Sequence, residues 1–369
     1  MVVVGTRPEI VKMQPILNEI EQRREFKLCF VHTGQHYDWC MAAGIMQELK
    51  LPQPDCFLNV GSGSHAQQTA RIIARLEPIL KKYTPDFVLV EGDTNSGMGA
   101  ALAAAKLNFA VVHIEAGCRS FDRSMPEEIN RIVIDDLSTI LYAPTNTCFK
   151  NLLNEGINQK SIFLTGHPIV DLIDTLKPKL RATETLSKFG VKKRDFYLAT
   201  LHRDKNVDQK EHLVNILKAF NHIAKERPVI FPAHPRTMKR IRQFHLLNLI
   251  NSAKPILPLD YASTLVLISQ ARSVLTDSGG IQQEALLLGT PCITLRDTTE
   301  WVETVELGVN FLTGSNTDLI TSAVQNVENN LASIHDKLSK TQNVYGDLGV
   351  AKRILDVLLA KISVNSSSV

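Results

Sequence analysis

Short apolar runs rich in Val, Ile and Phe alternate along the chain with segments that show the apolar periodicity of helices. The first series of runs lies at residues 2–4, 27–32, 87–90, 109–114, 140–143 and 162–164. The second series lies at 196–201, 229–232, 256–259, 273–276 and 292–295, and the amphipathic segments include 66–83, 209–226 and 317–331. This alternation predicts an α/β fold with parallel sheets that are covered by helices on both faces.

The two series are separated near residues 170–195, where the chain is charged and contains Pro178, as is typical of a linker. A chain of 369 residues is also longer than one ordinary hydrophobic core requires. The pattern therefore predicts two doubly wound domains, the first ending at residue 170 and the second starting at residue 171.

Polar residues follow many of these runs directly. They lie at 5–9, 33–36, 91–94 and 115–117 in the first half, and at 202–203, 234–236, 276–280 and 296–300 in the second. Ligands of doubly wound domains bind beyond the carboxyl ends of the strands, so these residues form one predicted rim in each domain. Two facing rims would make an interdomain cleft for a small molecule.

The segment Ser278-Gly279-Gly280 lies between a short apolar run and a predicted helix. A helix N-terminus offers unpaired N–H groups to an anion, and glycine lets the backbone approach it closely. Ser278 can equally act as an ordinary N-cap. The segment alone is compatible with a phosphate site and with a structural turn.

Three carboxylates, Asp93, Glu115 and Glu127, fall at neighbouring positions on the first rim. The second rim carries His202, Arg203, His234 and Arg236. Crowded carboxylates tend to have raised pKa values, which suits acid–base chemistry near neutral pH. Asp93 as a helix N-cap, and Glu127 as an acid favoured by a helix dipole, are the structural alternatives.

Composition narrows the class of protein. Apolar residues make up 44% and charged residues 21% of the chain, and the net charge of +3 is small and dispersed, so we expect no nucleic-acid partner. No run of 18 apolar residues and no signal peptide is evident, so we expect no membrane partner. Six scattered cysteines, with Cys29 and Cys292 among apolar neighbours, indicate reduced thiols in a cytoplasmic enzyme without a zinc site.

Common cofactor motifs are missing from the sequence. There is no Walker pattern, and no G-x-G-x-x-G follows the first run, which argues against an ATPase and a nicotinamide enzyme. His113 and His167 are possible metal ligands, but isolated histidines are more often structural.

Several motifs, in chain order, resemble those of the non-hydrolysing UDP-N-acetylglucosamine 2-epimerases. They are Gly5-Thr6-Arg7-Pro8-Glu9, Gly92-Asp93-Thr94, His113-Ile114-Glu115-Ala116-Gly117, Met125-Pro126-Glu127-Glu128-Ile129-Asn130-Arg131, Thr276-Asp277-Ser278-Gly279-Gly280-Ile281-Gln282, Arg296-Asp297-Thr298-Thr299-Glu300 and Tyr345-Gly346-Asp347. The resemblance implies a GT-B-type fold of two Rossmann-like domains, in which residues 346–369 pack back on residues 1–170. It also implies a homodimer, a UDP-sugar substrate, and no metal or other cofactor.

The resemblance further implies a mechanism in which UDP leaves by anti-elimination to give 2-acetamidoglucal and then adds back with protonation of the other face of C2. Asp93, Glu115, Glu127 and His202 would be catalytic. The residues implied to bind the substrate are Arg7, Lys12, Gln35, Arg203, His234, Ser278, Gly279, Gly280, Glu284 and Arg296. Ser278, Gly279 and Gly280 would hold the diphosphate and Glu284 the ribose, while uracil would lie near 231–234 or 259–261.

Some segments depart from the common bacterial pattern. Trp301-Val302-Glu303 and Arg119-Ser120-Phe121-Asp122 look more like the archaeal branch and its relatives that act on UDP-diacetamido-uronic acids. Epimerisation of such a uronic acid is therefore one alternative. A GT-B glycosyltransferase and a hydrolytic epimerase that releases free UDP are two others.

Overall fold

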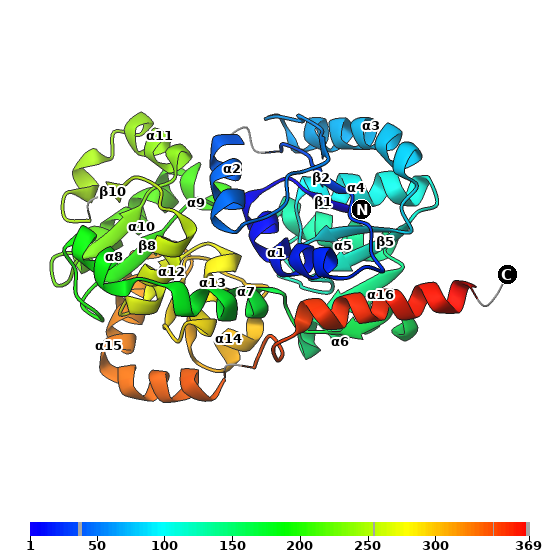
Figure 1. The fold of residues 1–369 in the computed structure, drawn as a ribbon. Coiled ribbons are helices and arrows are strands. Elements are labelled where there is room, and N and C mark those ends of the chain that lie inside the picture. The colour runs from blue at the N-terminus through cyan, green and yellow to red at the C-terminus, as the bar shows by residue number, and fades with distance from the viewer. Residues whose placement is uncertain (36–38, 254, 342, 367–369) are drawn as a thin grey trace. The chain divides into compact units, whose positions relative to one another are not determined.

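The computed structural model describes residues 1–35, 39–253, 255–341 and 343–366. The chain divides into two compact units (Figure 1). Unit 1 comprises Met1–Thr175 and Tyr345–Val369, and unit 2 comprises Leu176–Val344.

Unit 1 is built on a parallel sheet of seven strands in the order β3-β2-β1-β4-β5-β6-β7. The strands are β1 (Val2–Val4), β2 (Phe30–His32), β3 (Cys56–Phe57), β4 (Phe87–Glu91), β5 (Ala110–Ile114), β6 (Ile140–Ala143) and β7 (Ile162–Leu164). Its helices are α1 (Arg7–Gln22), α2 (Trp39–Glu48), α3 (His65–Tyr83), α4 (Asn95–Lys106), α5 (Pro126–Leu137), α6 (Asn146–Asn154), α7 (Ile169–Leu176) and α16 (Val350–Ser366), with a 3₁₀ turn at Gln159–Ser161.

Unit 2 has a parallel sheet of six strands in the order β10-β9-β8-β11-β12-β13. The strands are β8 (Tyr197–Thr200), β9 (Val229–Pro232), β10 (Pro255–Ile256), β11 (Val274–Thr276), β12 (Cys292–Thr294) and β13 (Asn310–Leu312). The helices are α8 (Ala182–Phe189), α9 (Asp204–Val207), α10 (Lys210–Ile223), α11 (Pro235–Gln243), α12 (Tyr261–Gln270), α13 (Gly279–Leu287), α14 (Val302–Glu306) and α15 (Thr317–Lys340), with 3₁₀ turns at Lys177–Lys179 and Leu247–Ile250.

Both strand orders are the doubly wound order predicted from the β-α alternation, so the fold class is confirmed. The order reverses between β1 and β4 in unit 1 and between β8 and β11 in unit 2. Ligand sites of such sheets lie at these switch points, beyond the carboxyl ends of the strands. The two reversals therefore indicate where each unit binds a ligand.

Close packing of α3 on α4 positions one of these strand ends. Gly99 of α4 has no room for a side chain, because a Cβ there would lie 2.8 Å from Cγ2 of Ile72 in α3. The core beneath α3 and α4 is apolar and includes Val88 and Val90 of β4. The N-terminus of α4, directly after Asp93, is thus held rigidly against the sheet.

The C-terminal helix α16 belongs to unit 1, although unit 2 precedes it in the chain (Figure 1). Asp171 caps its start by accepting hydrogen bonds from Gly349 N at 2.7 Å and Ala351 N at 2.9 Å. Tyr142 of β6 donates to Ile354 O at 2.8 Å, and Arg23 at the end of α1 pairs with Asp356 at 2.6 Å. Polar contacts to three segments therefore fix α16 on unit 1.

Several sequence expectations need correction. The stretch 170–195, expected to be a linker, holds α7, α8 and a 3₁₀ turn. The helix expected at 317–331 runs to Lys340 and is kinked at Asn330, whose side chain donates to Asn326 O at 3.0 Å. Strands β3 and β13 were not predicted, because neither coincides with a long apolar run.

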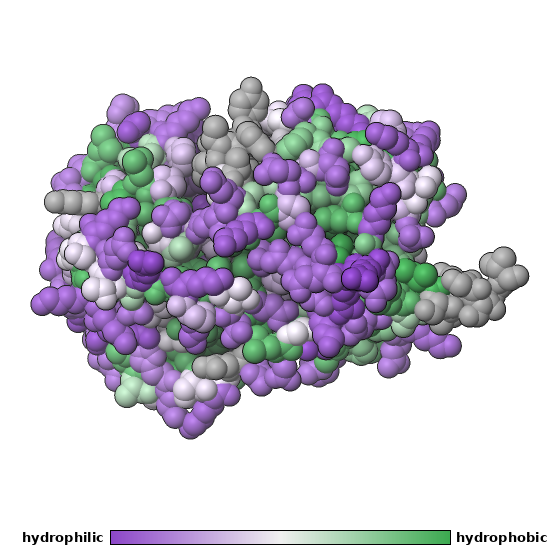
Figure 2. Space-filling model, viewed as in Figure 1, coloured by the Kyte–Doolittle hydropathy of each residue, from purple (hydrophilic) through white to green (hydrophobic). Residues whose placement is uncertain are grey.

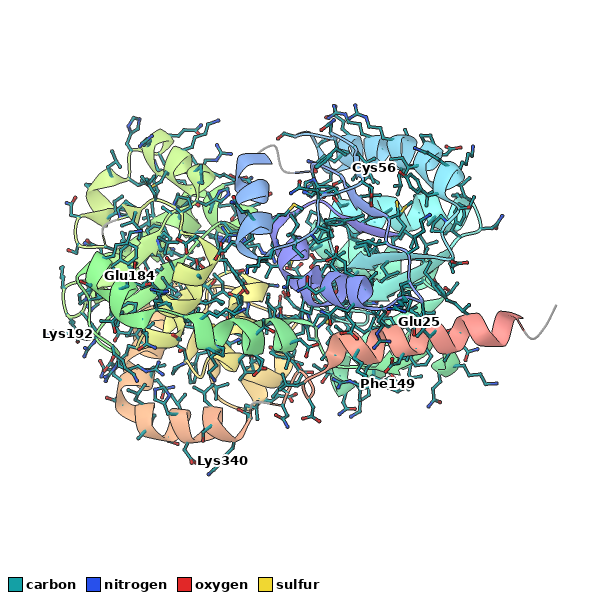
Figure 3. All side chains as sticks on the ribbon, in the orientation of Figure 1. Glu25, Cys56, Phe149, Glu184, Lys192 and Lys340 are labelled. Atoms are coloured by element: carbon teal, nitrogen blue, oxygen red, sulfur yellow. The ribbon has the colours of Figure 1, made fainter. Side chains whose placement is uncertain are left out.

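The surface seen in Figure 2 is largely hydrophilic, with smaller hydrophobic areas between the charged side chains. Lys340, labelled in Figure 3, lies at the end of α15 with its side chain in solvent. Cys29, Cys118, Cys148 and Cys292 are buried free thiols, as the composition predicted for Cys29 and Cys292. Within the described part of the chain, no helix combines the length and apolar character that crossing a membrane needs.

Candidate active site

The carboxyl end of the unit 1 sheet holds a buried group of charges around Lys12 of α1. Its Nζ lies 2.5 Å from Oε2 of Glu115 and 3.0 Å from Oε1 of Glu91. His167, after β7, brings Nε2 to 2.6 Å from the same oxygen of Glu115. The ammonium of Lys12 therefore connects the ends of β4 and β5. Oε2 of Glu115 contacts both Lys12 and His167.

The backbone of Glu115 has a positive φ of 74°, which a side chain other than glycine rarely adopts. Such strain persists only where the surroundings determine the geometry, and it occurs often at functional sites. Here the ion pair with Lys12 and the contact with His167 hold the carboxylate.

Charge and burial act differently on the neighbouring carboxyls. Burial opposes ionisation of Glu115, but Lys12 and the hydrogen bond with His167 outweigh it and hold the Glu115 pKa well below its usual value. Burial raises the pKa of Glu91 despite the same lysine. The sequence-based expectation of a raised pKa is therefore wrong for Glu115, because a cation lies against it.

Glu91, Glu115 and His167 offer ligand atoms within 4.8 Å of one another, a spacing at which a metal could bind. The ammonium of Lys12 already lies beside both carboxylates. A cation of the protein itself thus supplies the charge that a metal would bring.

Asp93 lies two residues after β4, at the unit 1 switch point. Its carboxylate pairs with the guanidinium of Arg131, and its carbonyl accepts from Asn130 Nδ2 at 2.8 Å. Arg131 also donates to Glu128 at 2.7 Å. The N-cap role considered for Asp93 is taken by Thr94, whose Oγ1 accepts from Gly97 N at 3.0 Å. Asp93 is therefore placed by α5 and is not the cap of α4.

Glu127 lies in the first turn of α5 and is half-buried, beside the fully buried Glu128. Glu128 accepts from Ser120 N at 3.0 Å and Phe121 N at 2.9 Å, and so fixes the loop that leads into α5. The two adjacent glutamates thus differ: Glu128 is a structural anchor, and Glu127 remains the candidate for chemistry.

Arg7 begins α1 and is half-buried. Gln35 follows β2, and its Oε1 accepts from Ser96 N at 2.9 Å and from Ser96 Oγ at 2.7 Å. Gly5 lies against the same serine, because a Cβ there would lie 2.0 Å from Ser96 Oγ. The loops after β1 and β2 therefore meet the N-terminus of α4, and the Gln35 oxygen is engaged within unit 1.

His113 is structural, as isolated histidines usually are. It is buried, with Nδ1 2.6 Å from Asp135 Oδ1 and Nε2 2.8 Å from Gly92 O. These contacts hold the turn that precedes Asp93.

In unit 2 the segment after β11 starts α13, as the sequence suggested. Ser278 is the N-cap, with its Oγ 3.5 Å from Ile281 N. A Cβ on Gly279 would lie 2.1 Å from Oε1 of Glu300, whereas one on Gly280 would meet nothing closer than Ser278 Oγ at 3.9 Å. The carboxylate of Glu300 therefore leaves no room for a side chain at position 279. The space beside Gly280, at the N-terminus of α13, is open.

Asp277, which the sequence did not single out, links this turn to the loop after β8. It is fully buried and accepts from His202 N at 3.1 Å, Arg203 N at 2.9 Å and Asn206 Nδ2 at 3.2 Å. Its Oδ1 also lies 3.0 Å from His202 Nδ1. Its position directly before Ser278 was the available signal, because a polar residue at a buried strand end needs partners.

The other candidates of unit 2 have defined partners. Glu284 is buried and accepts from the hydroxyl of Tyr261 at 2.9 Å, and Arg296 pairs with Glu300 at 2.9 Å. His234 is exposed after β9 and caps α11 through Nδ1, which accepts from Arg236 N at 3.2 Å. Arg236 in turn pairs with Asp204 and Asp208.

Sequence reasoning also missed Glu9. This buried residue accepts from Gly5 N at 2.9 Å, Thr6 N at 2.7 Å and Thr94 Oγ1 at 2.7 Å. Thr6 and Glu9 form a capping box, and their Thr-x-x-Glu spacing is a signal that could have revealed it. Glu9 joins the loop after β1 to the residue that follows Asp93.

The chain is similar to known proteins over most of its length. The family model described as UDP-N-acetylglucosamine 2-epimerase matches residues 18–359. A UDP-N-acetylglucosamine 2-epimerase homolog of Methanococcus maripaludis is 44% identical over 362 residues, which cover 96% of this chain and 98% of that protein. The UDP-2,3-diacetamido-2,3-dideoxy-D-glucuronate 2-epimerase of Pseudomonas aeruginosa is 38% identical, with coverage of 97% and 98%.

Solved structures show the same likeness. The crystal structure of Methanocaldococcus jannaschii UDP-GlcNAc 2-epimerase in complex with UDP-GlcNAc and UDP is similar with a TM-score of 0.88 and 41% identity, covering 97% of this chain and 99% of that one. A glycosyltransferase from Rickettsia africae is similar with a TM-score of 0.60 and 15% identity, covering 96% of each chain, which shows the fold alone. The GT-B-like fold expected from the sequence is thereby confirmed.

Proposed function

Because the chain belongs to the UDP-N-acetylglucosamine 2-epimerase family, we propose that it interconverts UDP-GlcNAc and UDP-ManNAc by inverting C2 of the sugar. The observation that carries the proposal is the pair of carboxylates at neighbouring strand ends, Asp93 after β4 and Glu115 after β5, each against its own cation. Such a pair suits proton transfer on both faces of one carbon.

The reaction must avoid a free carbanion at C2, which no neighbouring carbonyl stabilises. A base removes the C2 proton while the C1–O bond to UDP breaks, and the electron pair of the C2–H bond forms the C1=C2 double bond of 2-acetamidoglucal. UDP then attacks C1 again, and C2 takes a proton on its other face. The elimination therefore needs a group that accepts the C2 proton, and the addition needs a group that donates a proton to C2.

In unit 1 we assign this proton transfer to Asp93, Glu115 and Glu127. The low pKa of Glu115 keeps it ionised, so it enters the cycle as an acceptor or as a fixed anion. Lys12 stabilises the charge of Glu115. We assign Lys12, together with Arg7 of the same helix, to stabilising the negative diphosphate when it leaves the sugar. Gln35 keeps the loop after β2 next to α4.

In unit 2 we assign the diphosphate to the N-terminus of α13, where Ser278, Gly279 and Gly280 lie. Helix N-termini favour anions through their N–H groups and dipole. His202 and Arg203 are held beside this turn by Asp277. Glu284 is assigned to the ribose, His234 to the uracil region, and Arg296 supports the turn through Glu300.

Exchange at C2 tests the proposal directly. Purified protein is incubated with UDP-GlcNAc in deuterated water, and the sugar protons are followed by NMR. We expect loss of the C2 proton signal and appearance of UDP-ManNAc. If UDP-ManNAc formed without deuterium at C2, or if free UDP accumulated steadily, non-hydrolysing epimerisation would be ruled out.

A second substrate has support in the similarity to the Pseudomonas enzyme that acts on a diacetamido-glucuronate. The same incubation with the UDP-diacetamido-uronic acid discriminates between the two. We expect a higher kcat/KM for UDP-GlcNAc. A reversed preference would assign the chain to the uronic-acid substrate and leave the reaction type unchanged.

A further inference from the structure

One buried carboxylate organises the ligand end of unit 2. Asp277 is fully buried: Oδ1 accepts from His202 N, and Oδ2 accepts from His202 N, Arg203 N and Asn206 Nδ2. Asn206 also donates to Leu295 O at 2.8 Å. Asp277 thereby connects the turn after β11 with the loops after β8 and β12.

The same carboxylate faces the ring of His202. Nδ1 lies 3.0 Å from Oδ1 of Asp277, and 43% of the His202 side chain is exposed. An ionised carboxylate only accepts hydrogen bonds, so Nδ1 must carry a proton. Nε2 is then the ring nitrogen that is turned away from Asp277 and available to a ligand.

The charge of Asp277 supports this assignment. Burial opposes ionisation, but His202 and the hydrogen bonds from the backbone of His202 and Arg203 outweigh it and lower the pKa of Asp277. The carboxylate of Asp277 is therefore anionic at neutral pH. An anion at Nδ1 fixes both the tautomer and the orientation of an imidazole.

We propose that Asp277 is a positioning residue of the epimerase site: it orients His202 so that Nε2 accepts a hydrogen bond from a hydroxyl group of the UDP-sugar, next to the N-terminus of α13. The inference rests on the proposed function and deepens it, because it names the residue through which His202 acts. Asp277 touches no substrate atom in this role.

An Asp277→Asn substitution separates positioning from simple structural support. The oxygen of Asn can keep the bonds from Arg203 N and Asn206, which face Oδ2. Its amide then replaces Oδ1 and donates to Nδ1, so His202 must adopt the Nε2–H tautomer. The shape is nearly unchanged, while the ring nitrogen presented to the ligand changes from acceptor to donor.

NMR of ¹⁵N-labelled histidine, with the His202 signals assigned from a His202→Asn variant, reads the tautomer without any turnover. We expect the Nδ1–H form in the natural protein and the Nε2–H form in Asp277→Asn. The same tautomer in both proteins would overturn the proposal. Because the measurement needs no substrate, a protein that failed to epimerise UDP-GlcNAc would refute the proposed function and leave this test intact.

Kinetics of the double variant give the second measurement. In the natural background Asp277→Asn should lower kcat/KM by about 10- to 100-fold, the range for losing a hydrogen bond to a charged group. In the His202→Asn background the further loss should be under about 2-fold, since coupled residues are not additive. An equal loss in both backgrounds would show plain structural support and overturn the inference. Asp318→Asn, an exposed acid in the first turn of α15, is the matched control.

Discussion

The charge of Glu115 is set by its partners and not by its exposure. Its strand-end position made it a candidate for acid–base work, yet Lys12 and His167 meet on one of its oxygens, at 2.5 and 2.6 Å. Asp93 likewise has a guanidinium against it. At the scale of the residue, Asp93 and Glu115 each lie against a cation of unit 1, and for Glu115 this cation helps to lower the pKa.

Asp93→Asn should reduce turnover by about 100-fold or more, the usual contribution of a general acid or base, while UDP binding stays nearly unchanged. C2 exchange in deuterated water measures the first quantity and calorimetry with UDP the second. Asp86→Asn, an exposed change at the other end of β4, is the control and should behave as the natural protein. Near-normal exchange by Asp93→Asn would remove Asp93 from the catalytic set.

Lys12→Met leaves Glu91 and Glu115 buried without their cation. Removing one partner of a buried ion pair costs about 3–5 kcal/mol, so the free energy of unfolding in urea should fall by that order. Adding Glu115→Gln should restore part of it, because the ionised carboxylate left without Lys12 disappears. Lys81→Met breaks an exposed pair with Glu77 and should change stability by less than about 0.5 kcal/mol. Equal effects of the two lysine changes would contradict the assignment.

At the scale of the element, the N-terminus of α1 is tied to that of α4. Glu9 caps α1 and also accepts from Thr94, the cap of α4. Burial raises the pKa of Glu9 to about 7 despite these hydrogen bonds. The junction beside Asp93 therefore contains a carboxyl that titrates near neutral pH.

Glu9 should make the folding stability fall with rising pH. Its folded pKa of about 7 exceeds the ordinary 4.5, so the folded state binds the proton more tightly, and stability is lost as pH rises from 4.5 to 7. A difference of this size corresponds to about 3 kcal/mol. Glu9→Gln can keep the bonds to Gly5, Thr6 and Thr94 and should flatten this dependence, measured by urea unfolding from pH 4.5 to 8. An unchanged slope would contradict the titration of Glu9.

The elements also show what the sequence could and could not predict. Strands such as β6 and β9 are continuous apolar runs and were predicted at their observed bounds, whereas the two residues of β3 have no such run. Asp93 and Glu115 were found because strand-end positions follow from local pattern. Their partners could not be predicted in this way, because only tertiary folding brings them together. Asp93 and Arg131 are 38 residues apart, and Lys12 and Glu115 are 103 residues apart.

The same limit applies in unit 2. The Ser278 turn was visible as a local motif, but Asp277 and His202 lie 75 residues apart, and their contact depends on β8 pairing with β11. Which of the two functions of a helix N-terminus applies, cap or anion site, was left open by the sequence. Ser278 serves as the cap, and the open space at Gly280 is compatible with the second function.

At the scale of the whole molecule, two glycines allow the chain to return to unit 1. Gly166 and Gly346 both have positive φ, and a Cβ on Gly346 would lie 2.8 Å from Cα of Gly166. Next to them His167 N donates to Tyr345 O at 2.8 Å. This crossing places His167 where it meets Glu115, so the return of the chain also shapes the candidate site.

Gly346→Ala should therefore destabilise the protein by about 1–3 kcal/mol more than Gly156→Ala, the cost of overpacking. Gly156 has nearly the same φ, 87° against 88°, but nothing lies within 4 Å of its added Cβ. Because both substitutions strain the backbone to the same extent, the difference between them reports the steric clash of the added Cβ at position 346 with Gly166. Thermal unfolding of both variants measures the difference, and equal losses would show that the crossing tolerates a methyl group.

The return of α16 has a consequence for how the protein is made. Unit 1 draws on both ends of the chain, and the whole of unit 2 is inserted between Thr175 and Tyr345. A ribosome therefore synthesises α16, which packs on α1, only after every residue of unit 2. Until α16 is made, the side of α1 that it covers stays exposed, so we expect chaperones to bind the first 175 residues during translation until α16 emerges.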